Sequence, residues 1–114
     1  MTVRTLTLDE LNRATLARQR LLPREQPPYS DERSGSERPR DADVVSAVER
    51  VAGLQSQDSR AAAIGLWTRV PGLRREQIAD LLRRRLLVKG TLMRATLHLV
   101  SAADYLLLRP AVQR

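Results

Sequence analysis

Near the start of the chain, apolar residues recur at helical spacing, and three leucines form a partial stripe along one side. Thr7 precedes this stripe, and Glu10 follows Thr7 in the Thr-x-x-Glu pattern of a helix-capping box. The pattern predicts a helix over about residues 8–20.

A second apolar stripe begins after a long polar segment. Residues 23–41 hold four prolines and mixed charge with almost no apolar side chain. This composition predicts a mobile insertion or linker, because it is too long for an ordinary connection between helices. The valines that follow fall on one face of a second helix, which Asp41 or Asp43 is expected to cap and Gly53 to end.

The clearest helical pattern lies in residues 73–90, where isoleucine and leucine recur at i, i+3, i+4 and i+8. We expect Gly90 to lie just past the end of that helix. The segment 64–70 before it is too short for its spacing to distinguish a helix from a strand. Pro71-Gly72 predicts a turn between the two.

Apolar positions after residue 90 predict two short strands with almost no loop between them. The first would contain Leu92 and Met93, and the second would span about residues 97–100. Ser101 then begins a Ser-x-x-Asp cap for a last helix, which Pro110 is expected to bend or end. Three helices followed by a two-stranded ribbon are the winged helix-turn-helix plan, mainly α with a small β-ribbon (α+β).

The amino-acid composition indicates the kind of partner that such a domain would bind. The chain has 114 residues and 42% hydrophobic content, which is enough for a single winged-helix domain over residues 1–114. Its net charge is +7, and 20 of its residues are basic, of which only Lys89 is a lysine. Arginine forks bind phosphate bidentately, so nucleic acid is a fitting partner; a solvated basic surface is the alternative. The residues that the winged-helix plan would use on DNA are Arg60, Arg74, Arg75, Lys89 and Arg94.

Several kinds of chemistry are disfavoured by what the chain lacks. It has no cysteine and one histidine, His98, so we expect no metal site, no disulfide and no Ser–His triad. His98 is interpreted as a strand residue with a local hydrogen bond, and Trp67 as part of the core. The run Arg83–Arg85 fits either phosphate contacts or a solvated helix end. The chain shows neither a signal peptide nor a long apolar run, and we expect a soluble cytoplasmic protein without a cofactor.

The tripeptide Gln55-Ser56-Gln57 is the main candidate for chemistry. On a helix, residues two apart point about 200° away from each other, and the tripeptide would be an ordinary polar helix end. On an extended backbone both carboxamides project from one face. Together they could hold a water or grip a base edge, but they have no accessible pKa. They would therefore suit a reaction with an activated leaving group, such as an N-alkylated purine, in which placing the water is most of the task.

Three segments together resemble the start of a known family. They read LNRATLARQRLLPR, VERVAGLQSQDSRAAAIGLWTRVPGL and LVKGTLMRATLHLVSAADYLLLRPAVQ. They are similar to the winged-helix DNA glycosylases, the AlkZ-like and YcaQ-like bacterial proteins that excise alkylated bases and unhook interstrand crosslinks. The resemblance implies a catalytic Gln-x-Gln motif at Gln55 and Gln57, which would position the water that attacks the anomeric carbon.

The resemblance also implies a longer protein. Family members carry several tandem winged-helix domains, so residues 1–114 would be the N-terminal portion, binding damaged double-stranded DNA as a monomer and inactive as an isolated chain. The full-length form would be a glycosylase that excises N-alkylated purines or unhooks crosslinks. The alternative is a non-catalytic winged-helix DNA-binding protein or transcription regulator. A regulator should dimerise on a palindromic site, whereas a glycosylase acts on damage with little sequence preference.

Overall fold

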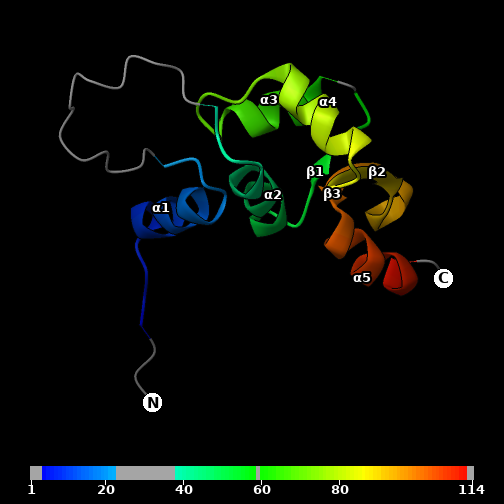
Figure 1. The fold of residues 1–114 in the computed structure, drawn as a ribbon. Coiled ribbons are helices and arrows are strands. Elements are labelled where there is room, and N and C mark those ends of the chain that lie inside the picture. The colour runs from blue at the N-terminus through cyan, green and yellow to red at the C-terminus, as the bar shows by residue number, and fades with distance from the viewer. Residues whose placement is uncertain (1–3, 23–37, 59, 113–114) are drawn as a thin grey trace, which may run out of the picture.

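The computed structural model describes residues 4–22, 38–58 and 60–112 (Figure 1). Its elements are α1 Leu8–Arg18, α2 Asp41–Arg50, β1 Leu54–Gln55, α3 Ala61–Trp67, α4 Arg75–Arg83, β2 Leu87–Thr91, the 3₁₀ turn Met93–Ala95, β3 Leu97–Ser101 and α5 Ala102–Val112. Most of the loop expected at 23–41 lies outside the described residues, and α2 begins within that range at Asp41.

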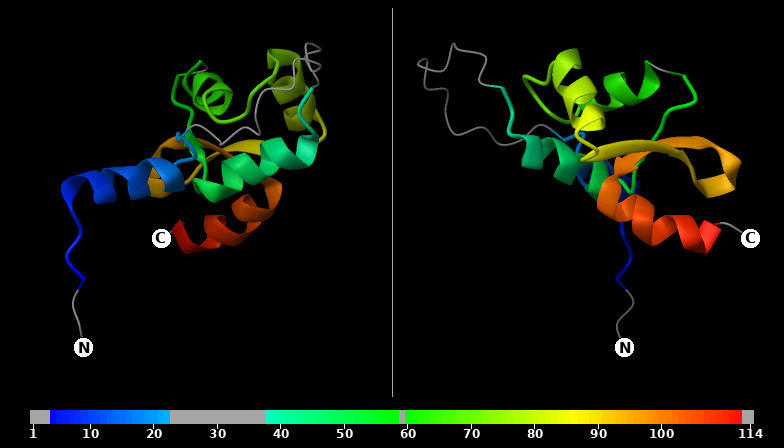
Figure 2. Two further views of the ribbon diagram at one scale, coloured as in Figure 1. Left: turned by 90° about the vertical axis from the view of Figure 1, so that its left-hand side faces the viewer. Right: turned by 45° about the vertical axis from the view of Figure 1, so that its right-hand side comes forward.

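The three strands form one antiparallel sheet in the order β1-β3-β2. His98 in the central strand lies opposite Gln55 on one side and Gly90 on the other. Helices α3 and α4 lie on one side of this sheet and α5 lies on the other (Figure 2). The predicted fold class is confirmed: the chain is a mixed α+β domain compatible with the winged-helix plan, in which β2 and β3 form the ribbon.

The core lies between helices α2, α3 and α4 and one face of the sheet. Its largest fully buried apolar side chains are Leu66, Leu81, Leu87, Leu99, Val44 and Val48. The expected core position of Trp67 is wrong, since Trp67 is 45% exposed. The segment of uncertain type, 64–70, contributes to helix α3, which turns Leu66 inward. The next residue is rotated by about 100°, and this rotation carries Trp67 away from the core.

Helix α1 begins as the sequence predicts but does not join the core. Its capping box is present: the Glu10 amide donates to Thr7 Oγ1 at 3.2 Å, and the Thr7 amide donates to Glu10 Oε2 at 2.8 Å. None of its residues is buried. Arg69 holds its end through Nε to Gln19 O at 2.9 Å and Nη2 to Gln19 Oε1 at 3.2 Å. The three helices of the winged-helix plan are therefore α2, α3 and α4, and the predicted first helix stands outside them.

Three helices end in the same turn, which carries one residue in the left-handed conformation. Those residues are Arg20 (φ 56°), Ala52 (φ 55°) and Arg85 (φ 59°). At the end of α1, the Arg20 amide donates to Ala17 O and the Leu21 amide to Leu16 O, which is the Schellman pattern. At the end of α2, Ala52 takes the left-handed position, and Gly53, the expected stop, follows it with φ 94°.

The expected aspartate cap of α2 is wrong. The residue that caps α2 is Arg40, whose side chain makes no capping hydrogen bond. Asp41 and Asp43 lie in the first turn instead, where their negative charge favours the positive end of the helix dipole.

The boundary between α4 and the ribbon also differs from the prediction. Helix α4 ends at Arg83, and the leucine-rich continuation becomes strand β2, which pairs with β3 from Leu87 to Thr91. Gly90 thus lies within a strand. Leu92 and Met93, expected in the first strand, belong to the connection between the strands. Whether this segment is a helix or a strand depends on its pairing with β3. The spacing of apolar residues along the chain carries no information about that pairing.

The last helix follows the prediction at its start and differs further along. The Asp104 amide donates to Ser101 Oγ at 3.1 Å, as the Ser-x-x-Asp pattern predicts. Pro110 does not end the helix, because α5 continues to Val112.

Candidate functional site

The glutamine pair lies on extended chain at the edge of the sheet. Gln55 is in β1, and the Ser56 amide continues the pairing by donating to Leu97 O at 2.7 Å. The Ser56 side chain is 1% exposed, whereas both glutamines are exposed. Gln55 and Gln57 are thus exposed on either side of the buried Ser56, and Gln57 lies in the bend that follows β1. That both carboxamides share one side of the chain stays a prediction.

Gln57 has a fixed carboxamide orientation. Its Oε1 accepts a hydrogen bond from the Leu97 amide at 2.9 Å. This side-chain oxygen therefore extends the pairing with β3 past the end of β1. A backbone N–H can only donate, so the carboxamide oxygen faces β3 and its NH₂ group is left as a donor toward solvent.

His98 lies on the same face of the sheet as Gln55. The bond between Ser56 and Leu97 makes Gln55 and His98 the neighbouring non-hydrogen-bonded pair, in which opposite side chains approach most closely. His98 is 9% exposed, and its Nδ1 lies 2.9 Å from Thr96 O. A carbonyl only accepts, so Nδ1 donates, and Nε2 of the neutral ring is an acceptor. The expected local hydrogen bond of His98 is thus present.

Residues predicted to contact DNA occupy two separate regions. Arg94 lies in the connection between β2 and β3, with φ 55°, and this connection leads directly to Leu97, the partner of Gln57. Lys89 lies in β2 opposite Leu99, and Arg60 precedes α3; all three side chains are exposed. The structure therefore groups the glutamine pair with the tip of the ribbon and Arg94.

Arg74 and Arg75 are exposed at the other end of the domain, where α4 begins. The first turn of α4 contacts the start of α2, because Gln77 Nε2 donates to Pro39 O at 2.7 Å and to Asp41 Oδ1 at 2.9 Å. The ribbon tip extends away from this end (Figure 2, right). The predicted basic residues thus line two ends of the domain rather than one patch.

The arginine run after α4 is partly neutralised by carboxylates. Arg83 pairs with Asp80, and Arg84 bridges Asp80 at 2.7 Å and Asp41 at 2.5 Å. The hydrogen bond from Arg84, with a second from Gln77, lowers the pKa of the Asp41 carboxyl below its ordinary value. The hydrogen bond from Arg83, with another from Arg84, lowers the pKa of Asp80. Arg84 therefore joins α4 to α2, and Arg83 forms an ion pair within α4, which favours the structural reading of these two residues.

A second group of arginines was missed by the reasoning from sequence. Arg18, Arg20 and Arg50 line one pocket, although they come from two helices that the long polar segment separates. The only signal in the sequence was a basic residue near the end of each helix, which the helix dipole already explains. Their convergence depends on where the end of α1 lies relative to the end of α2, and periodicity carries no information about that position.

Two further properties concern the part of the chain that the structure describes. None of its helices has the length and apolar composition that a membrane span requires. Within the same residues, no three histidine, cysteine, aspartate or glutamate side chains gather in a way that could hold a metal ion.

The fold and the glutamine pair define the class: a winged-helix-like α+β domain with two carboxamides beside the tip of its ribbon. The model of the family described as DNA glycosylase AlkZ-like matches residues 48–114, more than half of the chain. The chain therefore belongs to the AlkZ-like DNA glycosylase family. The match includes both glutamines and all five predicted DNA contacts, but it begins within α2, after the N-terminal segment of the expected resemblance. Neither a curated protein nor a solved structure matches.

Proposed function

We propose that residues 1–114 form the first winged-helix domain of a DNA glycosylase, in which Gln55 and Gln57 position the attacking water. The observation that supports this proposal is the exposure of both carboxamides, on either side of the buried Ser56, in a chain of the AlkZ-like family. Had these residues continued a helix, the two amides would point apart and could not share a ligand.

The two carboxamides can offer complementary groups to one water. Gln57 presents its NH₂ group, because Leu97 occupies its oxygen. Gln55 lies opposite His98, whose Nε2 acceptor favours the NH₂ group of Gln55 and so leaves the Gln55 oxygen for the water. A water held there accepts from Gln57 and donates to Gln55, which fixes the direction of its lone pair.

The reaction that suits this site needs little acid or base assistance. In an N7-alkylated guanosine the base carries a positive charge. The water oxygen forms a bond to the anomeric carbon while the glycosidic bond breaks, and its electron pair leaves with the base, which becomes neutral. The excess proton of the water passes to solvent, since a carboxamide is not a base at neutral pH. Placement of the water is then the main contribution of the protein.

Duplex DNA is the proposed partner, with the exposed cations of the domain on its phosphates. Arg60 and Arg94 lie in the segments next to the glutamine pair, and Lys89 lies on β2, on the far side of β3; all three would contact the strand that carries the lesion. Arg74 and Arg75, at the start of α4, would contact the major groove or its edges. By itself the 114-residue chain should bind DNA weakly and release little base.

The test is base release from duplex DNA that contains N7-methylguanine, using the complete product of the gene. Gln55→Ala and Gln57→Ala should each lower the single-turnover rate by about a hundredfold, as loss of water placement predicts. DNA affinity should change little, because neither residue carries charge.

Asn12→Ala is the matched control, since it removes an exposed carboxamide from α1, outside the family match. It should leave base release unchanged. Release at the wild-type rate by the double variant Gln55→Ala/Gln57→Ala would remove the catalytic proposal. A non-catalytic DNA-binding protein would then be the better description, provided that duplex affinity remained.

A further inference from the structure

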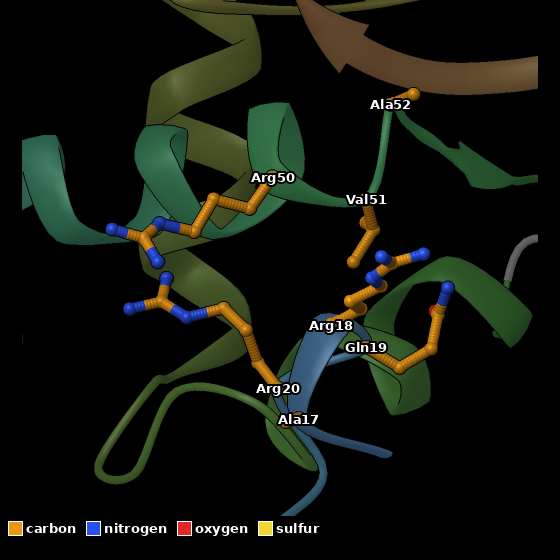
Figure 3. A pocket seen from close by; sticks show the side chains of 7 residues that line it. All are labelled: Ala17, Arg18, Gln19, Arg20, Arg50, Val51 and Ala52. Carbon is orange, nitrogen blue, oxygen red and sulfur yellow. The ribbon is translucent and has the colours of Figure 1, made fainter. Parts of the chain in front are cut away.

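A pocket of about 480 Å³ lies between the end of α1 and the end of α2 (Figure 3). Its lining residues are Ala17, Arg18, Gln19, Arg20, Arg50, Val51 and Ala52. Arg20 and Arg50 extend toward one another, and Arg18 lies farther along, beside Val51 (Figure 3). Three guanidinium groups from the ends of two helices thus share one concave surface.

The charged side chains among the described residues that line this pocket are all arginines. No acidic residue is among those that line it in the described chain. The negative ends of the α1 and α2 dipoles favour Arg18 and Arg50, the last residues of these helices. Arg20 lies beyond the end of α1, and its side chain extends toward Arg50 (Figure 3). Neighbouring guanidinium groups repel each other because both are positive. An anion bound between them is attracted to both and offsets that repulsion.

The pocket lies close to the glutamine pair. Ala52 is part of its wall, and Gln55 follows three residues later in β1. A chain spans at most about 3.3–3.6 Å per residue, so the Cα atoms of Ala52 and Gln55 lie within roughly 11 Å. Double-stranded DNA advances about 3.4 Å per nucleotide along each strand. A phosphate within a few nucleotides of a base held at the glutamine pair would therefore reach this pocket.

We propose that Arg18, Arg20 and Arg50 bind a backbone phosphate of the DNA strand, close to the nucleotide that Gln55 and Gln57 hold. This inference rests on the proposed function, because the position of the nucleotide is taken from it. Arginine suits the task, since its planar fork donates two parallel hydrogen bonds to phosphate oxygens and keeps its charge. The phosphate would fix the register of the strand relative to the glutamine pair.

The experiment removes two of these charges and measures duplex binding against salt. Arg18→Gln/Arg50→Gln should lower affinity at low salt and reduce the slope of log K against log salt by about one per lost contact. The charge-matched control is Arg4→Gln/Arg40→Gln, whose parent side chains are 80% and 84% exposed and lie outside the pocket. The proposal is overturned when both double variants bind with the same affinity and slope.

A second measurement locates the phosphate on the strand. The probe is a duplex with one abasic-site analogue, in which single phosphates on either side are replaced in turn by neutral methylphosphonate. Replacement of one phosphate near the analogue should lower the affinity of the wild-type protein for the duplex severalfold. The same replacement should leave the affinity of the Arg18→Gln/Arg50→Gln variant unchanged. Equal sensitivity of both proteins at every position would contradict the assignment to a strand phosphate.

Failure of this inference can be distinguished from failure of the proposed function. A changed salt slope together with normal base release by the glutamine variants keeps the phosphate site and removes the catalytic role. A salt slope that the arginine variant leaves unchanged, together with base release that the glutamine variants lose, removes the phosphate site and keeps the catalytic role. Inorganic phosphate is the last arm: at matched ionic strength it should displace DNA no better than chloride. Much stronger displacement by phosphate would point to a free anion as the ligand and would also overturn the proposal.

Discussion

Gly90 shows how strongly a single absent side chain can determine the packing of this domain. It is buried in β2 opposite His98, and the ring of Tyr105 from α5 occupies the space that a Cβ atom would need. The contact is to ring atoms rather than to backbone, so relief requires the tyrosine to move. Gly90 is thus the position at which α5 approaches the ribbon, and its backbone needs no unusual φ.

We predict that Gly90→Ala lowers the free energy of unfolding by about 1–3 kcal/mol, the usual cost of overpacking. The measurement is chemical denaturation of the wild-type and variant chains. Tyr105→Ala provides the matched background, because a smaller residue at 105 leaves room for the added methyl group. In that background the cost should largely vanish, giving a coupling energy in the double-mutant cycle. An equal cost in both backgrounds would show that the clash with Tyr105 is not its source.

At the candidate site, residue types could be predicted but their bonding could not. The Gln-x-Gln pattern and its family resemblance identify Gln55 and Gln57, and alternation on an extended chain predicts that they share a side. The bond from Leu97 to Gln57 depends on the register of β1 against β3, two segments far apart in the chain. No local pattern specifies that register, so the orientation of the amide emerges only from the fold.

Among the elements, α2 and α4 are joined by charged groups as well as by apolar packing. Asp41 in the first turn of α2 accepts from Gln77 and Arg84, and Asp80 of α4 accepts from the same Arg84. These bonds connect the helix that follows the polar segment to the helix expected to enter the major groove. Stability of this junction should therefore depend on the ionisation of the two carboxylates.

We predict that this junction weakens in acid. Hydrogen bonds from arginine lower the pKa of Asp41 and of Asp80, so both carboxylates stabilise the folded state above the ordinary carboxyl range. That stabilisation is lost as the pH falls below about 4 and through the lowered folded-state values. Denaturation midpoints measured between pH 6 and pH 3 should fall more steeply for the wild type than for Asp41→Asn/Asp80→Asn. Asp9→Asn, outside the junction, should follow the wild type, and parallel curves for all three would refute the prediction.

The elements were predictable where local chemistry decides them and unpredictable where pairing does. The Thr7–Glu10 capping box and the Ser101 cap form as their sequence patterns indicate. The segment 87–91 continues the leucine-containing pattern of α4, and it becomes β2 because it pairs with β3. The short apolar segment at 61–67 has the opposite outcome: it becomes helix α3 over the sheet.

For the whole molecule, the excess of arginine is distributed over several surfaces. The predicted DNA contacts lie at the ribbon and at the start of α4, and a further group of arginines lies at the ends of α1 and α2. Some of the arginines, such as Arg83 and Arg84, are in ion pairs and contribute less to an external field. A net charge of +7 thus supports contact with a curved duplex at several points rather than at one.

We predict that binding of undamaged duplex is strongly salt-dependent. If the five predicted residues each neutralise a phosphate, the slope of log K against log salt should be about −4 or steeper. Fluorescence anisotropy between about 50 and 200 mM salt measures it. Lys89→Gln/Arg94→Gln should make the slope shallower by about two, while Arg4→Gln should leave it unchanged. Affinity that is constant over this range would exclude a phosphate-based mode of binding.

The hydrogen bonds from Arg69 to Gln19 determine where helix α1 lies relative to the rest of the domain. Helix α1 buries none of its own residues, and the two hydrogen bonds from Arg69 bind its C-terminal turn to the segment that follows α3. Replacing Arg69 would let that helix drift, and Arg18 and Arg20 would drift with it, away from Arg50. A residue that meets no nucleic acid would thus set the spacing of the groups that do.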